Sequence, residues 1–444
     1  MSSAGVVTQY ASELRALCGG EHVIESPAEL ERYRILGMTP VLAVEPASPD
    51  EVASVLRLAN DLKLNLVPTG GFTQQQMGNT PPQVDVVLLT TRLTEVEHYD
   101  PADLTVGVGA GFTVSQLSVM VAANGLLFAV DPPLPDRSTI GGVLATGRHG
   151  PLRHGFGGIR EFCIGLHFVT GDARRAKGGG RVVKNVAGYD LMKLLIGSHG
   201  TLGIITSASF KLFPTPRQTR TYIAEFSSAA DAIEFRDRLL RSPLSPMCLE
   251  LVSPGARQLL RPGMDANSWV VCVRAAGSDA VLRRYRLELG VTASREVEGQ
   301  SEQDLWRVVQ NFSESLQAQH ADLLLMSLSL PLRDVKRVVS EIEIMAQSND
   351  LAVATIGRIG AGHLQTALWP LTGGDATGAK LVTTVSTLRA QLSRDASMMV
   401  QLCPARVRTQ INPWGPTPTD VASMRAVKQA LDRHDILNRG RFLL

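Results

Sequence analysis

The chain has 444 residues, a length that corresponds to about two or three domains. Hydrophobic residues make up 44% and charged residues 19%, proportions that are typical of a globular protein and exclude a disordered one. Lysine plus arginine (44) nearly balance aspartate plus glutamate (42), and the resulting net charge of +2 argues against a nucleic-acid-binding protein, which depends on clustered cations.

Membrane insertion and export are not expected. No run of about 18 apolar residues occurs, so the sequence predicts no transmembrane segment. Residues 1–20 contain Glu13 and Arg15 and lack the apolar stretch of a signal peptide. The five cysteines are scattered and form no C-x-x-C pair, so we expect neither a disulfide framework nor an iron–sulfur cluster held by this chain alone.

The first hundred residues alternate strand-like and helix-like patterns. Residues 41–45 predict a strand, and the S-P-D-E motif at 48–51 predicts the capped start of a helix. Apolar runs at 64–68 and 84–89 predict two further strands, separated by the turn-rich stretch 69–82. This order indicates an α+β or α/β arrangement.

The next segment imitates a dinucleotide-binding fingerprint. A predicted strand at 104–108 is followed by Gly109-Ala110-Gly111 and by a helix over 113–124. Asp131 stands about 20 residues further on, as the fingerprint requires, but Val114 replaces its third glycine. Two interpretations remain, a nicotinamide-binding turn and a tight strand-to-helix turn, and the missing glycine favours the second.

A domain boundary is predicted at Pro214-Thr215-Pro216, which interrupts an alternating strand pattern. Beyond it, helical and extended patterns alternate and predict a compact antiparallel α+β module, followed by an amphipathic helix near 419–433. The helical patterns cover 229–241, 279–289 and 333–347, and the extended patterns cover 269–275, 322–329 and 351–356.

Glycine is concentrated in one part of the chain, since 16 of the 40 glycines fall between residues 141 and 203. Glycine costs backbone entropy, so this density indicates turns with positive φ or a ligand that lies directly against the main chain. Three segments, 67–73, 138–147 and 197–205, combine glycine with hydroxyl side chains after or before a strand. Consecutive N–H groups in such loops can bind phosphate, although each segment alone is also compatible with an ordinary turn.

Together and in this order, the three segments resemble the FAD-binding domain of the vanillyl-alcohol oxidase and p-cresol methylhydroxylase (PCMH) superfamily. The most specific element is GGGRVVKNVAGYDLMKLLIGS at 178–198, and the similarity covers residues 38–216. It is closest to the FAD-binding E subunits of bacterial glycolate oxidases, whose ending is similar to W-G-P at 414–416 and I-L-N-R-G-R-F at 436–442.

The resemblance implies an α+β protein in three parts. Residues 1–216 would form a PCMH-type FAD-binding domain of two α/β subdomains, and residues 217–400 an antiparallel α+β cap module. Residues 401–444 would form a C-terminal tail that returns to the FAD domain.

The same resemblance implies FAD as the cofactor. The first loop contains no histidine, so we expect FAD to bind non-covalently. Gly70, Gly71 and Thr73 would donate N–H groups to phosphate oxygens, and the backbone of Ile204 and Ile205 would lie near the adenine. The full set of predicted cofactor-binding residues is Pro68, Thr69, Gly70, Gly71, Phe72, Thr73, Pro132, Ser138, Thr139, Gly141, Gly142, Ala145, Thr146, Gly147, Gly150, Gly155, Gly200, Gly203, Ile204 and Ile205.

The chain departs from the family pattern at the first loop, which usually reads R-G-G-G-T. Thr69 stands in place of the arginine and Phe72 in place of the third glycine. A phenyl ring at that position could weaken the contact between backbone and phosphate. The turn Asp172-Ala173-Arg174 also suggests a shortened hairpin.

No catalytic residue is assigned. Catalytic members carry an H-G-D-G-N-x-H type metal and substrate motif in the cap module, whereas residues 357–364 read GRIGAGHL with one histidine, His363, so no metal site is expected. Arg358 could bind a substrate carboxylate, or it could be an ordinary ion-paired arginine. Lys184 and Tyr189 could lie near the flavin, or they could simply pack within their loop.

Three functions remain open. The favoured one is an FAD-binding subunit of a glycolate oxidase-like 2-hydroxy-acid dehydrogenase, which would act with a paralogous FAD-linked catalytic subunit and pass electrons to an iron–sulfur subunit. The second is a structural paralogue with weakened or lost FAD binding, and the third is a self-sufficient FAD-linked oxidase of another small substrate. We expect the protein in the cytoplasm, or at the inner membrane through its partners.

Overall fold

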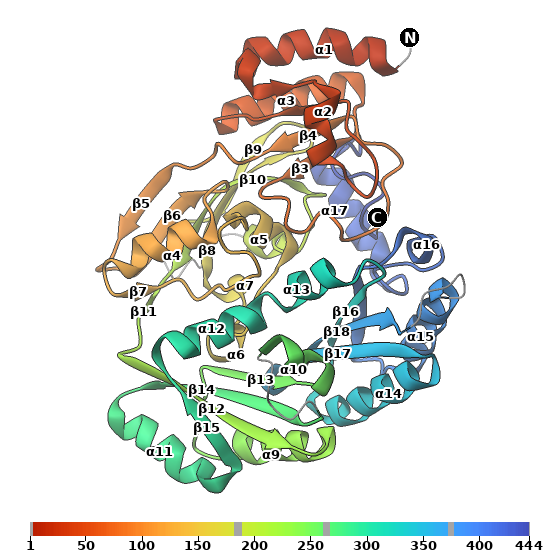
Figure 1. Cartoon of the computed structure of the whole chain (residues 1–444). Coiled ribbons are helices and arrows are strands. Elements are labelled where there is room, and N and C mark those ends of the chain that lie inside the picture. The colour runs from red at the N-terminus through yellow and green to blue at the C-terminus, as the bar shows by residue number, and fades with distance from the viewer. Residues whose placement is uncertain (1–2, 182–188, 261–266, 372–376, 444) are drawn as a thin grey trace. The chain divides into compact units, whose positions relative to one another are not determined.

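The computed structural model describes residues 3–181, 189–260, 267–371 and 377–443. The chain divides into two compact units, whose elements are labelled in Figure 1. Unit 1 comprises Met1–His149, Gly158–Thr215 and Thr417–Leu444, and unit 2 comprises Gly150–Gly157 and Pro216–Pro416. The tail therefore joins unit 1 from residue 417 onward, and the short segment 150–157 belongs to unit 2.

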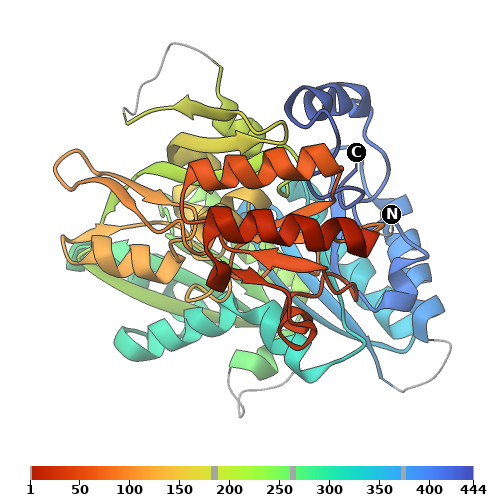
Figure 2. The ribbon, with the colours of Figure 1, turned by 90° about the horizontal axis from the view of Figure 1, so that it is seen from above.

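The first sheet of unit 1 contains the strands predicted in the first hundred residues. Its strands run in the order β1-β2-β4-β3, with β2, β4 and β3 parallel to one another. Helices α1 (Ser3–Cys18) and α3 (Pro49–Leu62) pack against each other and lie side by side in Figure 2. The strands are β1 (Val23–Ile24), β2 (Leu42–Val44), β3 (Leu66–Thr69) and β4 (Val86–Leu89).

The predicted cap of α3 is present with one change. The Ser48 hydroxyl accepts a hydrogen bond of 3.1 Å from the Glu51 amide, as expected of an N-cap. The Glu51 carboxylate accepts from the amide of Ala47, one residue before the position that a capping box requires. Both bonds satisfy amides near the start of the helix, so the sequence signal for its start was correct.

The second sheet of unit 1 is antiparallel, in the order β5-β6-β10-β8-β9. Its core is continuous with that of the first sheet, since Leu42 and Val86 belong to the same buried cluster as Val108 and Phe210. The strands are β5 (Val96–Asp100), β6 (Thr105–Gly109), β8 (Cys163–Thr170), β9 (Arg175–Gly179) and β10 (Gly203–Lys211). The smaller elements of the unit are α2 (Pro27–Leu30), α4 (Val114–Ala122), β7 (Leu126–Leu127), α5 (Ile140–Thr146), α7 (Ile159–Phe162), α8 (Leu191–Leu195), β11 (Phe213–Pro214) and α17 (Val421–Leu431).

The strand–GAG–helix segment is a tight turn. Strand β6 pairs antiparallel with β10, unlike the parallel strand of a dinucleotide-binding unit. A Cβ atom at Gly109 would lie 2.1 Å from the carbonyl oxygen of Leu93, and one at Gly111 would lie 2.3 Å from that of Thr90. Packing alone therefore requires these glycines, which supports the second interpretation of this motif.

Unit 2 is built on one antiparallel sheet of eight strands, in the order β15-β12-β14-β13-β17-β18-β16-β19. Helices α9, α10, α11, α12 and α14 pack on its strands, and α10, α12 and α13 also contact one another (Figure 1). The strands are β12 (Gln218–Phe226), β13 (Cys248–Val252), β14 (Trp269–Gly277), β15 (Ala293–Val297), β16 (Leu324–Ser329), β17 (Leu351–Arg358), β18 (His363–Pro370) and β19 (Ser397–Leu402). The helices are α6 (Arg153–Phe156), α9 (Ala229–Arg241), α10 (Pro254–Leu260), α11 (Asp279–Leu289), α12 (Gly299–Gln310), α13 (Phe312–Gln319), α14 (Val335–Ser348), α15 (Thr377–Gln391) and α16 (Ala405–Arg408).

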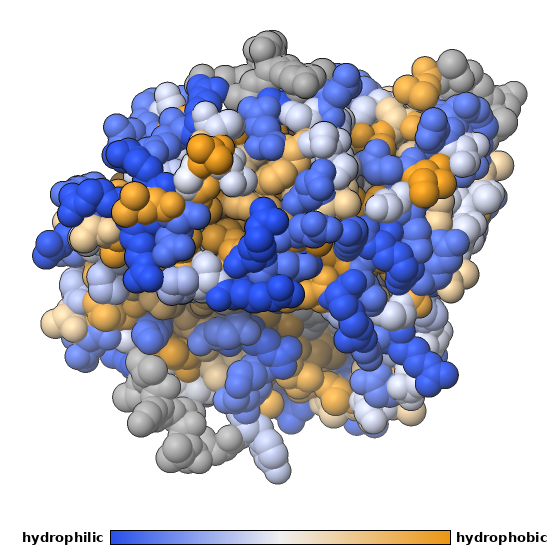
Figure 3. Space-filling model, turned by 90° about the horizontal axis from the view of Figure 1, so that it is seen from below, coloured by the Kyte–Doolittle hydropathy of each residue, from blue (hydrophilic) through white to orange (hydrophobic). Residues whose placement is uncertain are grey.

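These elements confirm the predicted α+β class and its antiparallel second module. Helices α9 and α11 have the predicted bounds, and α14 begins two residues later and ends one residue later than predicted. The face shown in Figure 3 is largely hydrophilic, with apolar side chains between the polar ones. None of the described helices combines the length and the apolar character needed to cross a membrane.

Candidate cofactor site

The first predicted loop lies directly against the second predicted segment. A Cβ atom at Gly70 would lie 2.0 Å from the hydroxyl oxygen of Thr139, and one at Gly71 would lie 1.7 Å from the carbonyl oxygen of Arg137. The Arg137 side chain also donates a hydrogen bond of 3.2 Å to the carbonyl of Gly71. Glycine is therefore needed at both positions, because any side chain would push the two segments apart.

The first loop presents unsatisfied backbone donors. Within the described part of the chain, the amides of Gly70, Gly71, Phe72 and Thr73 make no hydrogen bond to a protein acceptor. These four amides are consecutive and follow the end of β3. Successive N–H groups of this kind form a concave anion site, so the loop is suited to hold phosphate.

Phe72 has a backbone conformation that favours glycine. Its φ is 60°, in the left-handed region that favours glycine. Its ring packs on Tyr33, with ring centroids 5.6 Å apart, in a small apolar cluster that also includes Leu36 and Met38. The ring therefore packs against apolar neighbours within the protein.

The second segment forms α5, whose exposed face consists of small residues. The Thr139 hydroxyl caps the helix by accepting from the Gly142 amide, and Gly147 ends it with a φ of 62°. The helix buries Ile140, Gly141, Val143 and Leu144, and it leaves Gly142, Ala145 and Thr146 half-buried. Those three residues have the spacing i, i+3 and i+4, so they share one face on which a flat ligand can approach the main chain.

The third segment contacts both of the others. The Gly197 amide donates to the carbonyl of Leu144 (2.9 Å), and the His199 amide donates to that of Ala145 (2.7 Å). A Cβ atom at Gly200 would lie 2.8 Å from the ring of Pro68. The three glycine-containing segments, which are far apart in the sequence, therefore meet in unit 1.

Beyond this junction, Gly203, Ile204 and Ile205 begin β10. They pair with β8 on one side, while pairing with β6 starts only at Ser207. Both isoleucine side chains are buried in the core, so the backbone is the part of these residues that can meet a ligand.

Three buried polar atoms near this junction have no protein partner among the described residues: the hydroxyl oxygens of Thr69 and Ser198 and the side-chain carbonyl oxygen of Asn438. Buried polar groups are almost always hydrogen-bonded, so such a group needs an explanation. The unpaired loop amides and these three atoms fit a ligand that carries phosphate and hydroxyl groups, as FAD does.

Other predicted site residues make contacts within the protein itself or lie in unit 2. The Ser138 hydroxyl donates to the carbonyl of Pro133 (2.7 Å) and lies 3.3 Å from the Thr73 hydroxyl. Pro132, the residue before Pro133, is buried. Gly150 and Gly155 belong to unit 2, where a Cβ atom at Gly155 would lie 2.8 Å from the carbonyl oxygen of Met247.

Two residues of the run 178–198, Lys184 and Tyr189, were considered as possible neighbours of the flavin. Lys184 lies outside the described residues. The side chain of Tyr189 is 93% exposed.

The predicted set of cofactor-binding residues omits three contributors to this junction: Arg137, Asn438, and Ser198, which lies inside the predicted third segment. Ser198 and Asn438 carry two of the unpartnered atoms, and Arg137 binds the first loop. The I-L-N-R-G-R-F motif near the C-terminus was the available signal for Asn438, but nothing in it indicated a contact with the third segment.

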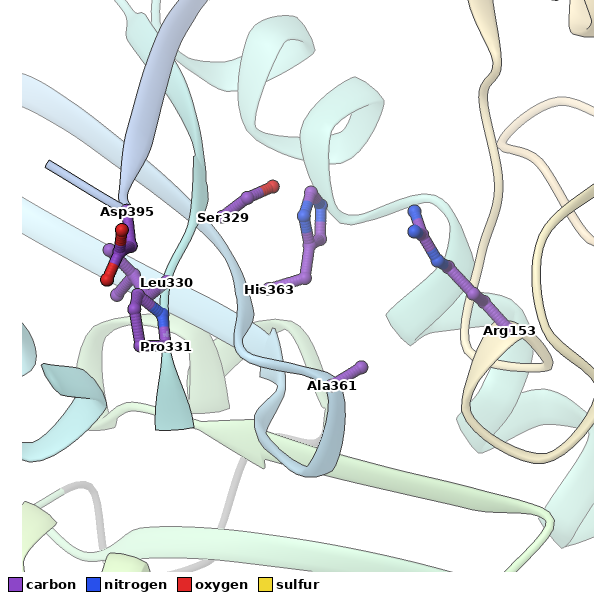
Figure 4. Close-up of a pocket in the computed structure, with 7 residues that line it drawn as sticks. All are labelled: Arg153, Ser329, Leu330, Pro331, Ala361, His363 and Asp395. Carbon is purple, nitrogen blue, oxygen red and sulfur yellow. The ribbon is translucent and has the colours of Figure 1, made fainter. Parts of the chain in front are cut away.

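Unit 2 contains a pocket of about 260 Å³. In Figure 4 the side chains of Arg153, Ser329 and His363 point toward one region of it. Ser329 and His363 are cross-strand partners at the ends of β16 and β18, and His363 Nε2 lies 3.4 Å from the Ser327 hydroxyl. The pocket is lined by Arg153, Ser329, Leu330, Pro331, Ala361, His363 and Asp395.

A guanidinium, an imidazole and a hydroxyl can together bind a small molecule that carries a carboxylate and a hydroxyl group. Among the described residues, no three histidine, cysteine, aspartate or glutamate side chains are grouped as metal ligands.

Arg358 lies away from this pocket's lining and is an internal structural residue. It is 4% exposed, donates a hydrogen bond of 2.8 Å to the carbonyl of Gly150, and lies 3.9 Å from the buried carboxylate of Glu250. Of its two predicted roles, the geometry supports the ion-paired one.

Two protein-family models match the chain, one in each unit. Residues 40–177 match the model of the FAD binding domain, and residues 215–386 match that of the C-terminal domain of FAD linked oxidases.

Curated relatives are similar over different shares of their length. A D-lactate dehydrogenase of Archaeoglobus fulgidus is 34% identical over 49% of this chain and 48% of its own length, so the chain aligns with about half of that relative. A D-2-hydroxyglutarate dehydrogenase of Xanthomonas citri pv. viticola is 28% identical over 94% of this chain and 93% of its own length. The glycolate oxidase subunit GlcE of Escherichia coli is 34% identical over 34% of this chain and 44% of its own length.

Among solved structures, p-cresol methylhydroxylase with substrate bound has the same fold. Its TM-score is 0.78 at 18% identity, covering 98% of this chain and 96% of that one. With both characteristic domains matched over most of its length, the chain belongs to the superfamily of FAD-linked oxidases and is an oxidoreductase that uses FAD.

Proposed function

We propose that this chain is the FAD-binding subunit of a glycolate oxidase-like 2-hydroxy-acid dehydrogenase complex. The observation that carries the proposal is the meeting of the three glycine-containing segments in unit 1, with unpaired loop amides beside them. The names of the relatives support the substrate class, because D-lactate, glycolate and D-2-hydroxyglutarate are all 2-hydroxy acids.

FAD, when bound, supplies the capacity to accept a hydride equivalent from the carbon atom that bears the substrate's hydroxyl group. The residues of the chain would bind and orient the reactants. The amides of Gly70, Gly71 and Thr73 would hold the pyrophosphate, and the face of α5 at Gly142 and Ala145 would lie against the cofactor. These contacts fix the cofactor without a covalent bond.

The pocket of unit 2 is the proposed substrate site. Arg153 would bind the substrate carboxylate through two parallel hydrogen bonds from its guanidinium. His363 and Ser329 would form hydrogen bonds with the 2-hydroxyl group. Its volume of about 260 Å³ suits a small organic acid. We propose no proton-transfer role for His363.

Electrons would leave through partner proteins. All five cysteines are buried thiols without disulfides, and the sequence has no C-x-x-C pair with which to hold a cluster. We therefore propose an iron–sulfur subunit as the acceptor and a paralogous FAD-linked subunit as a second flavin carrier. The relative named glycolate oxidase subunit GlcE is itself a subunit, which supports this assembly.

The first test is the visible spectrum of the purified chain, before and after incubation with FAD and removal of excess. We expect flavin absorption near about 450 nm, because the site fits the cofactor. A protein that remains colourless after incubation would instead be a structural paralogue. Phe72 favours that second function, since it replaces a glycine in the phosphate loop.

The second test identifies the substrate by measuring which acid reduces the flavin. Glycolate, D-lactate and D-2-hydroxyglutarate are each added anaerobically to the flavin-loaded complex, and flavin bleaching is recorded. We expect Arg153→Met to raise the concentration required for bleaching by about tenfold or more, since a charge-assisted hydrogen bond is lost. The exposed Arg160 provides the matched control, Arg160→Met. An unchanged response in Arg153→Met would remove Arg153 from the substrate site.

The third test concerns the assembly. Affinity purification of the tagged chain from its native host is expected to recover a second flavoprotein and a cysteine-rich protein. If the chain is recovered alone and turns over substrate with an artificial acceptor, it is a self-sufficient oxidase and the subunit assignment is wrong.

A further inference from the structure

We propose that residues 436–442 near the C-terminus form part of the cofactor site. In this proposal Arg441 is a positioning residue for the loop that follows β3, and Asn438 accepts a hydrogen bond from a hydroxyl group of the cofactor. The inference rests on FAD binding by unit 1 and is independent of the substrate proposed above.

The segment adds a strand-like edge to the first sheet. The Leu66 amide donates to the carbonyl of Ile436 (2.8 Å), and the Asn438 amide donates to the carbonyl of Leu66 (2.9 Å). Leu437 forms a parallel bridge with Leu66, the first residue of β3. The tail is therefore aligned with the strand that leads into the phosphate-binding loop.

A buried lysine ties the same segment to the third glycine-containing segment. Lys428 Nζ donates to the carbonyls of Thr201 and Leu437, both at 3.0 Å, and it pairs with Asp432 at 2.5 Å. The Asp432 carboxylate in turn accepts from the amides of Ile436 and Leu437. One charged group and its partner thus fix the start of the segment relative to residue 201.

Arg441 holds the distal part of the first loop. Its guanidinium donates to the carbonyls of Gln75 (2.9 Å) and Met77 (2.7 Å) and to the side-chain oxygen of Gln75 (2.5 Å). The Asn79 amide donates back to the carbonyl of Arg441 (3.0 Å). Nη2 donates to both carbonyls while Nη1 donates to the Gln75 side chain, a planar set of donors that lysine cannot reproduce. Arg441 therefore sets the position of the residues that follow the unpaired amides of 70–73.

Asn438 contributes an acceptor that lacks a donor. Its side-chain amide donates to the carbonyl of His199 (2.7 Å), which orients the group, and its carbonyl oxygen is buried with no protein partner among the described residues. The residue is only 5% exposed. A Cβ atom at Gly200 would lie 3.0 Å from the Asn438 amide nitrogen, which places the group beside the third segment.

The chemistry of this oxygen selects the part of the cofactor that it binds. An amide oxygen only accepts hydrogen bonds, so it would repel phosphate oxygens and attract a hydroxyl group. The two other unpartnered atoms near the junction, on Thr69 and Ser198, are hydroxyls that both donate and accept. Such a set complements a sugar or polyol, and FAD has hydroxyl groups on both its ribityl chain and its ribose.

The experiment measures the dissociation constant of FAD for refolded or dialysed apoprotein, by quenching of flavin fluorescence. Asn438→Gly keeps the backbone conformation, because φ at this residue is 47° and glycine tolerates it. We expect its FAD affinity to fall about threefold to tenfold, the effect of one lost hydrogen bond. We expect Arg441→Lys to weaken FAD binding about tenfold or more, because the loop that follows β3 loses its fixed position.

The control is Arg439→Ala. Arg439 lies in the same segment, but among the described residues its side chain donates only to the carbonyls of His434 and Asp435 and pairs with Asp435. Thermal melting of every apoprotein separates a cofactor effect from a folding effect, since a merely structural role lowers the melting temperature without changing the FAD affinity of the folded fraction.

Titration with ADP, which has the ribose but lacks the ribityl chain, distinguishes the two hydroxyl-bearing groups. Weaker ADP binding by Asn438→Gly would assign the contact to the ribose, and unchanged ADP binding would assign it to the ribityl chain. If both variants bind FAD as tightly as the unaltered chain, the tail is not part of the site. If the unaltered chain binds no FAD, the cofactor assignment itself fails.

Discussion

The Arg358 guanidinium donates a hydrogen bond of 2.8 Å to the carbonyl of Gly150, a residue 208 positions earlier in the chain. The same side chain lies 3.9 Å from the carboxylate of Glu250, and both residues are buried. This contact binds the short segment Gly150–Gly157 to the sheet of unit 2 and explains why it clusters with that unit.

We therefore predict that Arg358→Met destabilises the fold without acting on substrate affinity. Removing the Arg358 side chain deletes its buried hydrogen bond to Gly150 and the positive charge near the Glu250 carboxylate, which costs about 1–3 kcal/mol. Urea denaturation should show this loss, and the double variant Arg358→Met/Glu250→Gln should recover part of it. A normal free energy of unfolding together with a raised KM would restore the alternative in which Arg358 binds the substrate.

The sequence predicted elements best where local signals agreed. Helices α9 and α11 have an apolar face and follow Ser228 and Ser278, and their bounds were predicted to the residue. Helix α15 was not predicted, because its run Val382-Thr383-Thr384-Val385 is β-branched and favours strands locally. Its helix is stabilised by tertiary packing, with Leu381, Val385 and Leu388 buried in the core of unit 2.

Short segments of the predicted site could be identified from the sequence alone. The first loop, the α5 segment and the third segment were all identified as units of sequence, and the structure brings them together. Ser198 lies in the predicted third segment, but no local pattern marks its hydroxyl as unpartnered. Arg137 and Asn438 were missed because their contacts join chain segments far apart, such as the 239 positions between His199 and Asn438. No local pattern encodes such a pairing.

The lowered pKa of His199 predicts that the folded protein loses stability in acid. Burial, together with the charge of Arg441, lowers its pKa to about 3. Below the unfolded pKa of about 6.5 the unfolded chain binds a proton that the folded chain does not, so stability falls as the pH decreases from about 6.5 toward 3. His199→Gln should lose about 1–2 kcal/mol less than the unaltered chain between pH 7 and 5.

Melting temperatures at the two pH values check this prediction for His199. The half-exposed His167 on β8 provides the control His167→Gln, which should retain the full acid sensitivity attributed to His199. Equal acid sensitivity in His199→Gln and the unaltered chain would show that His199 is not the group responsible.

Gly71→Ala should disrupt the junction of the first two segments. Its methyl group would lie 1.7 Å from the carbonyl oxygen of Arg137, and such overpacking costs about 1–3 kcal/mol. We expect a lower melting temperature and loss of FAD binding in the same variant. Gly20→Ala is the control, since a Cβ atom at Gly20 has no other atom within 4 Å and its φ is not positive. A fully stable Gly71→Ala protein that still binds FAD would contradict the described contact.

Gly141→Ala and Gly142→Ala should have opposite effects on the apoprotein, although the two residues are adjacent in α5. A Cβ atom at Gly141 would lie 2.9 Å from the Ala110 Cβ, so this variant should unfold more easily. At Gly142 the nearest atom is the Thr139 hydroxyl oxygen, at 3.2 Å, which must shift by a few tenths of an ångström. This cost offsets only part of the roughly 0.5–1 kcal/mol by which alanine in a helix is favoured over glycine. Gly142→Ala should therefore melt at the same or a higher temperature than the unaltered chain.

The FAD affinity of Gly142→Ala then tests whether the cofactor lies on this face of α5. The added methyl group would occupy the surface on which we place the cofactor, so we expect FAD to bind at least about tenfold more weakly to a protein that is no less stable. Fluorescence titration of apoprotein and calorimetry of the same sample give the two quantities together. Because a general loss of structure would lower both, only direct contact between the cofactor and residue 142 predicts weaker binding with equal or greater stability, and unchanged affinity would place FAD elsewhere on unit 1.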